Sequence, residues 1–252
     1  MRAGFFRKLW IMGVSLYATL KISLAVLYRT YLRGGYPRSY ADGLFRWWAL
    51  KLLQTVRLNY TVHNPHGVCL QPNTPYIVMS NHRSHYDIPL IVMAIPGSVR
   101  MLTKKELFKV PIWGPALRVA EFVSIDRRNL EQAKKDLERA RESMESGIVL
   151  WIAPEGTRSR TGTLGAFKKG GFIMAIEAGA TIIPVGIRGS EKILPPKTWD
   201  FHIGQSVSVH IGAPIEASMH DLERKDELMA HVRRSISELS GEPEGLLQGK
   251  KG

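Results

Sequence analysis

The stretch YIVMSNHRSHYDIPLIVMA, residues 76–94, decides which fold we expect. Its first five residues are mostly apolar, which is typical of a strand buried on both faces of a sheet, and its last seven are typical of a short buried helix. A buried strand joined to a helix by one loop is the repeating unit of parallel α/β sheets. The loop between them, residues 81–87, is mostly polar, and such sheets bind ligands beyond the carboxyl ends of their strands.

The same alternation continues on both sides of this stretch. We predict strands at residues 59–63, 76–80, 99–103, 122–126, 148–153, 182–187 and 206–211. We predict helices at residues 88–94, 107–120, 130–146, 170–178 and 223–239. The sequence therefore predicts an α/β fold with a mixed, largely parallel sheet flanked by helices.

Three regions follow from this pattern. Residues 58–240 form the predicted α/β domain, residues 1–57 a helical hairpin, and residues 241–252 a frayed tail rich in Gly, Glu and Lys. The chain has 252 residues, of which 44% are hydrophobic, so it is neither disordered nor fibrous. Cys69 is its single cysteine, which excludes an intramolecular disulfide and leaves no second cysteine for a structural zinc site.

Charge is concentrated near the N-terminus. The net charge is +13, and residues 1–57 hold ten basic residues against one acidic residue, Asp42. Such an excess indicates an anionic partner. Because no helix-turn-helix, zinc-finger or RNA-recognition motif occurs, we expect a membrane surface with anionic lipids and no nucleic acid.

Residues 9–28 form an apolar run interrupted by Lys21. Its length, about 20 residues, suits a helix that spans a membrane, although a charge near the middle is costly. A signal peptide is a second interpretation, which Lys21 and Arg29 disfavour. We prefer a helix lying in the interface on the cytoplasmic face, with Ser15, Thr19 and Ser23 as a polar stripe and Lys21 reaching the headgroups.

A second basic and aromatic segment, residues 38–57, follows a turn at Gly34, Gly35 and Pro37. Trp47 and Trp48 in this segment suit membrane docking, and they equally suit the core beneath a capping helix. The two interpretations are compatible if they concern opposite faces of the helix. The first 57 residues are thus expected to be a two-helix hairpin that docks on membranes.

The loop after residues 76–80 carries a candidate acid–base pair. His82 and Asp87 are spaced so that a turn can bring the carboxylate to one imidazole nitrogen and leave the other facing a substrate, as a general base requires. A structural alternative is a capping box formed by Ser84 and Asp87. A metal site made of His82, His85 and Asp87 is another alternative, which no further cluster completes.

Two further strand ends are polar. Residues 154–160 read PEGTRSR, in which Arg158 offers a planar fork for a phosphate and Glu155 can orient a hydroxyl or pair with the arginine. A solvated turn is the structural alternative. Asp126, Arg127 and Arg128 end another predicted strand, and Lys104 and Lys105 follow a third, so each pair of basic residues is either a phosphate ligand or surface charge.

Taken together, these segments resemble the 1-acyl-sn-glycerol-3-phosphate acyltransferases, the lysophosphatidic acid acyltransferase family. The resemblance covers residues 76–187. The family pattern NHxSxxD matches Asn81, His82, Ser84 and Asp87; KxLxxxPxxG matches Lys105, Leu107, Pro111 and Gly114; IDR matches Ile125, Asp126 and Arg127; PEGTRS matches residues 154–159; FKxG matches Phe167, Lys168 and Gly170; and IPV matches Ile183, Pro184 and Val185. Ala153 departs from the pattern, because the family usually has phenylalanine there.

The resemblance implies a role for each matching residue. His82, held by Asp87, is the implied base that takes a proton from the sn-2 hydroxyl of lysophosphatidic acid. The implied substrate-binding residues are Lys105, Arg127, Glu155, Gly156, Thr157 and Arg158, and the implied supporting residues are Asn81, Ser84, Ser159, Lys168 and Pro184. No cofactor or metal is expected, because acyl-CoA or acyl carrier protein supplies the acyl group as a thioester and no covalent acyl-enzyme is needed.

Alternatives stay open within and outside this family. The acceptor could be another lysophospholipid or glycerol 3-phosphate. A metal-dependent lipid phosphohydrolase and a non-catalytic membrane adaptor are rivals from different classes. The wall of an acyl-chain tunnel could come from the N-terminal hairpin or from the helix after Lys105.

Overall fold

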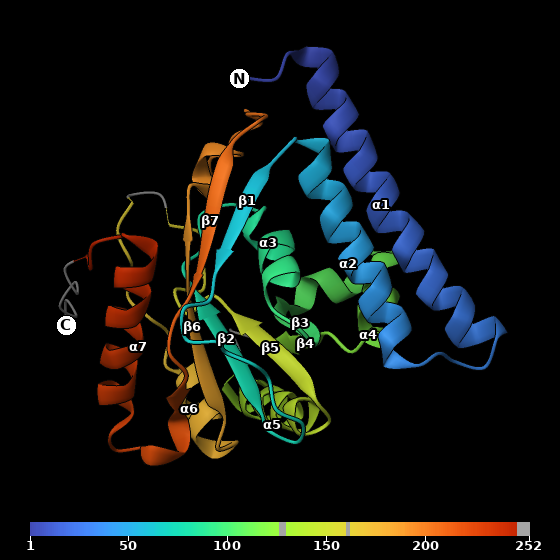
Figure 1. Ribbon diagram of the computed structural model, residues 1–252. Coiled ribbons are helices and arrows are strands. Elements are labelled where there is room, and N and C mark those ends of the chain that lie inside the picture. The colour runs from blue at the N-terminus through green and yellow to red at the C-terminus, as the bar shows by residue number, and fades with distance from the viewer. Residues whose placement is uncertain (126–129, 160–161, 246–252) are drawn as a thin grey trace.

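A computed structural model describes residues 1–125, 130–159 and 162–245 (Figure 1). Eight strands form one sheet: β1 (Asn59–His63), β2 (Tyr76–Ser80), β3 (Ser98–Lys104), β4 (Val123–Ile125), β5 (Ile148–Ile152), β6 (Thr181–Arg188), β7 (Ser206–Ile211) and β8 (Ile215–Glu216). The order across the sheet is β1-β7-β6-β2-β5-β3-β4, and β8 pairs with β6. Only the pairings of β6 with β7 and β8 are antiparallel among the strands described. The predicted mixed, largely parallel sheet is therefore confirmed.

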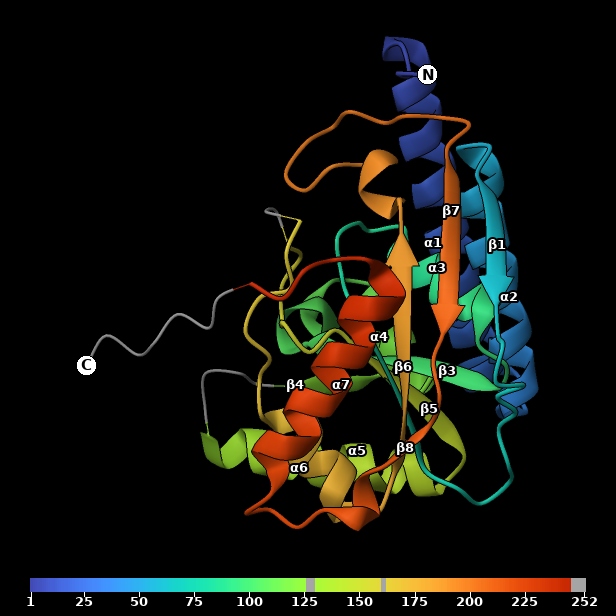
Figure 2. The same ribbon diagram turned by 60° about the vertical axis from the view of Figure 1, so that its left-hand side comes forward.

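Helices cover both faces of the sheet (Figure 2). They are α1 (Phe5–Leu32), α2 (Arg38–Thr55), α3 (Asp87–Ala94), α4 (Trp113–Val119), α5 (Leu130–Glu145), α6 (Gly170–Glu177) and α7 (Lys225–Ser240), with 3-10 turns η1 (Lys105–Lys109), η2 (Ser190–Lys192) and η3 (Ala217–Met219). Side chains of β2 alternate between the two faces: Val78 packs in the cluster that includes residues of α2 and α3, and Ile77 in the cluster with α6 and α7. This alternation explains why β2 is buried throughout and reads as a continuous apolar run.

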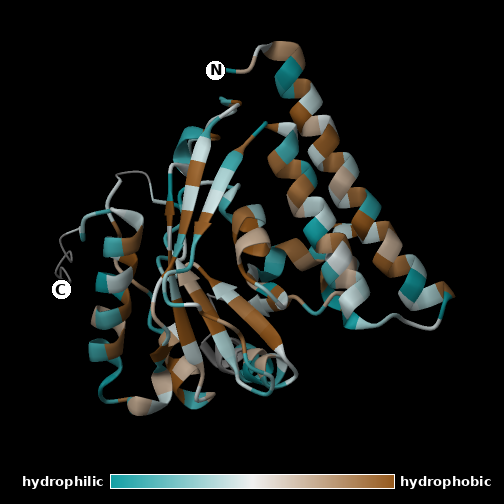
Figure 3. Ribbon diagram, in the orientation of Figure 1, coloured by the Kyte–Doolittle hydropathy of each residue, from teal (hydrophilic) through white to brown (hydrophobic). Residues whose placement is uncertain are grey.

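The N-terminal hairpin leaves one side of α1 uncovered. Figure 3 shows hydrophobic residues along the length of α1, and large apolar side chains on it are exposed to solvent, among them Phe5, Phe6 and Trp10. By length and composition α1 could cross a membrane, and no other helix of the described part of the chain meets that criterion. The polar stripe faces the other way: Ser15, Thr19 and Ser23 face a pocket between the hairpin and the α/β domain.

Lys21 contacts the second helix of the hairpin. Its Nζ lies 4.1 Å from the centre of the Trp47 ring, within cation–π range. The Lys21 side chain is exposed and lies over an aromatic ring of α2, and its contact with lipid headgroups stays a prediction. Contact with α2 thus satisfies the one charge inside the apolar run.

The start of α1 is fastened to the loop before β7. Asp200 accepts hydrogen bonds from Arg2 and from Lys8, both at 2.8 Å. These two positively charged side chains lower the pKa of the Asp200 carboxyl to about 2. The main-chain N–H of Ala3 also donates to Phe201 at 2.8 Å, so the hairpin is attached to the domain at this end.

The predicted helix at residues 107–120 is wrong as a single element. The chain forms η1, then turns at Ile112, whose φ is +65°, and begins α4 at Trp113. Pro111 cannot continue a helix from its N-terminal side, which explains the break. Gly114 is needed there, because a Cβ on it would lie 2.2 Å from the carbonyl oxygen of Phe108.

The end of the described chain is also different from the prediction. We expected a frayed tail from residue 241, but residues 241–245 pack back along the domain, and Leu164 bridges to Glu244. The N–H of Leu164 donates to Pro243 at 3.1 Å, and that of Gly245 donates to Leu164 at 3.1 Å. Long-range pairing therefore orders a polar segment whose composition suggested fraying. Residues 246–252 lie outside the described residues.

Candidate active site

The loop after β2 brings His82 and Asp87 together. Nδ1 of His82 lies 2.8 Å from Oδ2 of Asp87, and the Asp87 side chain is buried. Asp87 is the first residue of α3, where the helix dipole favours a carboxylate. The same Oδ2 accepts the N–H groups of Arg83 at 2.7 Å and Ser84 at 2.9 Å. One carboxylate oxygen thus both orients the ring and holds the turn.

The capping alternative is partly realised in the same contacts. Asp87 accepts the N–H of Ser84, which is half of a capping box. The hydroxyl of Ser84 makes no reciprocal cap and donates to the carbonyl of Leu194 at 3.2 Å. A structural role and an orienting role for Asp87 therefore coexist.

The His82 ring is held on its other sides as well. Trp151 of β5 meets it edge to face, with ring centres 5.5 Å apart. The indole N–H of Trp151 donates to Ser80 at 2.9 Å. No hydrogen bond to Nε2 of His82 occurs among the residues that the structure describes. Because the proton of a neutral ring belongs on Nδ1 beside Asp87, Nε2 has a lone pair free to accept a proton.

The second loop, PEGTRS, follows the adjacent strand β5. Gly156 adopts φ +73°, and its N–H donates to Ala153 at 2.9 Å, which turns the chain sharply. The buried Glu155 carboxylate accepts the N–H of Gly165 at 2.8 Å. Burial raises the pKa of Glu155 above its usual value, and the hydrogen bond from Gly165 opposes that rise.

Arg158 and His85 act on each other electrostatically. Burial lowers the pKa of His85, and the positive charge of Arg158 lowers it further. Arg158 is partly buried, while its neighbour Thr157 is exposed. The charge of Arg158 is therefore felt in the loop after β2 that carries His82 and His85.

The other residues expected at the site divide into scaffold and surface. Asn81 exchanges two hydrogen bonds with the main chain of Ile187 in β6, at 2.9 and 2.8 Å. Ser159 donates its hydroxyl to Thr163 at 2.9 Å. Lys168 donates its main-chain N–H to Pro154 at 2.7 Å and has an exposed side chain.

Pro184 lies at the point where β6 changes partners. It is buried opposite Met79 of β2, and its carbonyl accepts the N–H of Gly212 at 2.9 Å, between the segments that pair with β7 and β8. A proline fits inside a central strand only where its own N–H is not needed, as at such a switch. Pro184 thus has a role in the sheet and none that touches the site.

Lys105 and Arg127 are the two remaining residues that we expect to bind phosphate. Lys105 begins η1 at the end of β3, two strands from β2 and on the same edge of the sheet. Arg127, together with Asp126 and Arg128, lies outside the described residues. Their expected role stays a prediction.

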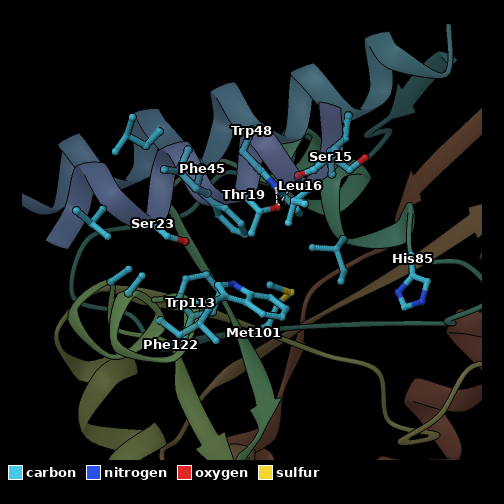
Figure 4. A pocket seen from close by; sticks show the side chains of 18 of the residues that line it. Ser15, Leu16, Thr19, Ser23, Phe45, Trp48, His85, Met101, Trp113 and Phe122 are labelled. Carbon is cyan, nitrogen blue, oxygen red and sulfur yellow. Dashed lines mark hydrogen bonds between the residues drawn. The ribbon is translucent and has the colours of Figure 1, made fainter. Parts of the chain in front are cut away.

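An apolar pocket of about 490 Å³ lies between the hairpin and the domain (Figure 4). Trp48, Phe45 and Leu16 line its hairpin side, and Trp113 and Met101 line the opposite side. Trp48 donates its indole N–H to Thr19 at 3.0 Å. His85 lies at one end of the pocket in Figure 4, three residues after His82. Both walls that we considered, the hairpin and the helix after Lys105, therefore contribute.

Several site residues were not anticipated from sequence. Trp151 could have been found from the sequence, because it is an aromatic residue near the end of a strand that precedes a polar loop. Leu194 and the buried Arg100 had none, because only packing brings them to Ser84 and to the pocket. Within the described residues, no three His, Cys, Asp or Glu side chains are grouped as metal ligands.

Comparison with known proteins agrees with this geometry. Residues 59–188, more than half of the chain, match the sequence profile of the Acyltransferase family. A 1-acyl-sn-glycerol-3-phosphate acyltransferase of Haemophilus influenzae is 30% identical over 66% of this chain and 70% of its own length. A chloroplastic enzyme of that name from Arabidopsis thaliana is 33% identical over 66% of this chain and 45% of its own length.

The fold is shared with a solved structure. The crystal structure of the 1-acyl-sn-glycerophosphate acyltransferase of Thermotoga maritima superposes with a TM-score of 0.74, covering 95% of this chain and 97% of that one at 24% identity. The chain spans about half the length of the Arabidopsis relative, with 45% of it matched. With the family profile and the Haemophilus relative both matched, the chain belongs to the acyltransferase family.

Proposed function

We propose that the protein transfers a fatty acyl group from a thioester to the sn-2 hydroxyl of 1-acyl-sn-glycerol 3-phosphate, giving phosphatidic acid. The observation that carries this proposal is the 2.8 Å contact between Nδ1 of His82 and Asp87 beside an apolar pocket. Acyltransferases of the same family that are named for this reaction support it.

Chemically, His82 is the general base. Nε2 takes the proton of the acceptor hydroxyl as its oxygen attacks the thioester carbonyl carbon, and Asp87 stabilises the imidazolium that forms. The carbon–sulfur bond then breaks, and the thiolate leaves with the proton returned by His82. A positioned base of this kind contributes about 10²–10⁴-fold, and the rest comes from holding the two substrates together.

Basic residues at the carboxyl edge of the sheet would bind the acceptor. Arg158, whose charge acts on His85 in the loop after β2, can form two parallel hydrogen bonds with a phosphate. Lys105 and Arg127 are proposed as further phosphate ligands. Glu155, Gly156 and Thr157 would shape the glycerol subsite, with Glu155 held in place by Gly165.

The pocket between the hairpin and the domain would take an acyl chain. Its volume, about 490 Å³, lies within the range of ligand pockets, and its lining is almost entirely apolar. Acyl-CoA and acyl carrier protein both present the thioester that the mechanism needs. No other cofactor is required by these steps.

Membrane association follows from the same substrate chemistry. The uncovered side of α1 carries large apolar side chains, and basic residues flank it, which suits an anionic bilayer surface. We propose monotopic docking on the cytoplasmic face, with lysophosphatidic acid entering from the bilayer. Carbonate extraction tests the topology: release from membranes supports docking, and retention supports deeper insertion.

Acylation of lysophosphatidic acid by purified protein in detergent, with acyl-CoA and acyl carrier protein compared as donors, tests the activity. We expect turnover in the wild type, its loss in His82→Ala, a raised acceptor KM in Arg158→Ala and no effect of a chelator. Full activity of His82→Ala would contradict the proposed base. Thioester-independent, chelator-sensitive phosphate release would instead identify a metal-dependent phosphohydrolase. Competition with glycerol 3-phosphate and other lysophospholipids identifies the acceptor.

A further inference from the structure

The buried carboxyl of Glu242 contacts both sequence neighbours of His82. Its Oε1 accepts a hydrogen bond from Nδ2 of Asn81 at 2.5 Å and lies 3.8 Å from Nη1 of Arg83. Glu242 belongs to the segment after α7, 160 residues downstream of His82 in the printed sequence. Only 5% of its side chain is exposed, although the residue lies in a segment of polar composition.

Both contacts lead by short steps to the His82–Asp87 pair. Arg83 holds Asp87 directly, since its main-chain N–H donates to Oδ2 of Asp87 at 2.7 Å. Asn81 fixes the other end of the loop by its two bonds to Ile187 in β6. A displacement of Asn81 or Arg83 would therefore move the main chain of His82 or its carboxylate partner.

The segment itself is held firmly enough to act as a support. The hydroxyl of Ser237 donates to the carbonyl of Glu242 at 2.6 Å. Arg233 donates to the carbonyl of Gly245 at 2.8 Å and pairs with Glu244 at 3.3 Å. The contacts of Leu164 with Pro243 and Gly245 join the same segment to the chain just after the PEGTRS loop.

Burying a carboxyl group in this way costs free energy unless its contacts compensate. Burial raises the pKa of Glu242 above its usual value, and the hydrogen bond from Asn81 and the charge of Arg83 oppose that rise. Oε2 has no hydrogen-bond partner among the described residues. A group kept at such a cost beside a catalytic loop points to a use other than stability.

We propose that Glu242 is a positioning residue that sets the orientation of His82 by holding Asn81 and Arg83 from the C-terminal side of the domain. The inference rests on the proposed acyltransferase function. Besides the loop after β2 and the PEGTRS loop, the site would then need a third segment of the chain, the one after α7. A misplacement of about 1 Å at a reacting group can cost about 10²-fold in rate, so small shifts matter.

Two substitutions separate the two contacts. Glu242→Gln keeps an oxygen that accepts from Asn81 and loses the charge that faces Arg83, whereas Glu242→Ala loses both. We expect kcat to fall about tenfold in Glu242→Gln and about 10²-fold in Glu242→Ala, with both KM values within about threefold of wild type. Glu238→Gln is the matched control, because Glu238 is an exposed carboxylate on α7, four residues from Glu242, and we expect wild-type kinetics from it.

Reactivity of His82 toward diethyl pyrocarbonate provides a readout that needs no substrate. Peptide mass spectrometry is expected to show its modification rate changed about threefold or more in both Glu242 variants, with the exposed His66 unchanged. If Glu242→Ala does not fold, Glu242→Gln carries the test alone.

The outcomes distinguish this inference from the proposed function. A wild type that acylates lysophosphatidic acid, together with Glu242 variants of unchanged kcat and His82 reactivity, overturns the positioning role and leaves the function standing. Equal losses in Glu238→Gln overturn it too, since the effect would then not depend on the contacts that Glu242 makes. A wild type without acyltransferase activity overturns the function, and His82 reactivity then decides the positioning role by itself.

Discussion

The N–H of Ser159 donates to the carbonyl oxygen of His82 at 2.8 Å, so the two polar loops of the site are joined main chain to main chain. The bond links residues that lie far apart in the sequence but follow neighbouring parallel strands, β2 and β5. The edge-to-face contact of His82 with Trp151 adds a second link between the same two strands. The proposed base and the PEGTRS loop are thus linked by two direct contacts.

Asp87→Asn tests how His82 is oriented. An amide can present its N–H₂ group to Nδ1 and so favour the wrong tautomer of the ring, and it accepts the N–H groups of Arg83 and Ser84 less strongly. We expect kcat to fall roughly 10²–10⁴-fold with a folded protein. Asp226→Asn is the control, since Asp226 is exposed on α7. Steady-state kinetics measure kcat of the two variants, and near-UV circular dichroism checks that they are folded. A kcat of Asp87→Asn within about twofold of wild type would contradict the role of Asp87 in orienting His82.

Ala116→Leu tests the pocket as the acyl-chain site. Ala116 is buried on α4 and lines the pocket, where it packs in one cluster with Val26 and Ala41. The added carbons would fill part of the cavity, so we expect the enzyme to prefer a shorter acyl chain. The KM for lysophosphatidic acid is expected to stay unchanged, because the contacts with its headgroup are not altered. A series of thioesters of increasing chain length measures the shift.

The control for this substitution is Ala178→Leu, at the end of α6, which packs in the core on the other face of the sheet and does not line the pocket. It is expected to lower stability without changing chain preference. An unchanged chain preference in Ala116→Leu would place the acyl chain elsewhere.

Combined replacement of Phe5, Phe6 and Trp10 by serine tests membrane docking. These side chains are between 59% and 84% exposed on α1, so their removal takes apolar area from the uncovered side without opening the core. We expect less of the protein to sediment with vesicles that contain phosphatidylglycerol, with a partition coefficient lowered about tenfold or more. The reason is that the burial of each large apolar side chain contributes roughly 1.5–3 kcal/mol when it is fully inserted.

Met219→Ser with Leu222→Ser is the matched control for docking, because both residues are exposed and apolar but lie between β8 and α7, far from α1 (Figure 1). Equal loss of vesicle binding in this double variant would show a nonspecific effect of surface hydrophobicity. Retained binding of the α1 variant would place the docking surface elsewhere.

Glu155→Gln tests the burial of the Glu155 carboxyl through the pH dependence of stability. The pKa of this group is raised in the folded state above its ordinary value of 4.5, chiefly by burial. The folded state therefore binds more protons than the unfolded state between those two values, and the stability contributed by Glu155 is present below pH 4.5 and lost as the pH rises through the folded pKa.

Glutamine does not titrate, so the Tm of Glu155→Gln relative to wild type is expected to rise from pH 4 to pH 8. Glu242 also has a raised pKa, and its negative charge adds to the rise at Glu155, so part of the difference in Tm reflects the coupling of these two groups. Thermal unfolding across that pH range measures the effect, with the exposed Glu106→Gln as control. A difference in Tm that does not change with pH contradicts a buried, titrating Glu155.

Much of the fold could be predicted because its signals are local. The five residues of β2 are apolar throughout since both faces of this strand are covered, and the polar residues after β2 and β5 mark the carboxyl edge of a parallel sheet. The break at Pro111 was also visible in the sequence, and the prediction of one helix across it gave too little weight to the proline.

What the sequence determined by itself is the order of strands and helices, the apolar hairpin and the presence of His82, Asp87 and Arg158 in loops at one edge. The tertiary structure decided which distant segments meet there. Glu242 reaches Asn81, Leu194 accepts from Ser84, and the pocket closes between α1 and α4, because packing of whole elements brings these residues together. Such contacts have no periodic signature along the chain, since their free energy depends on burial that exists only once the sheet and its helices have assembled.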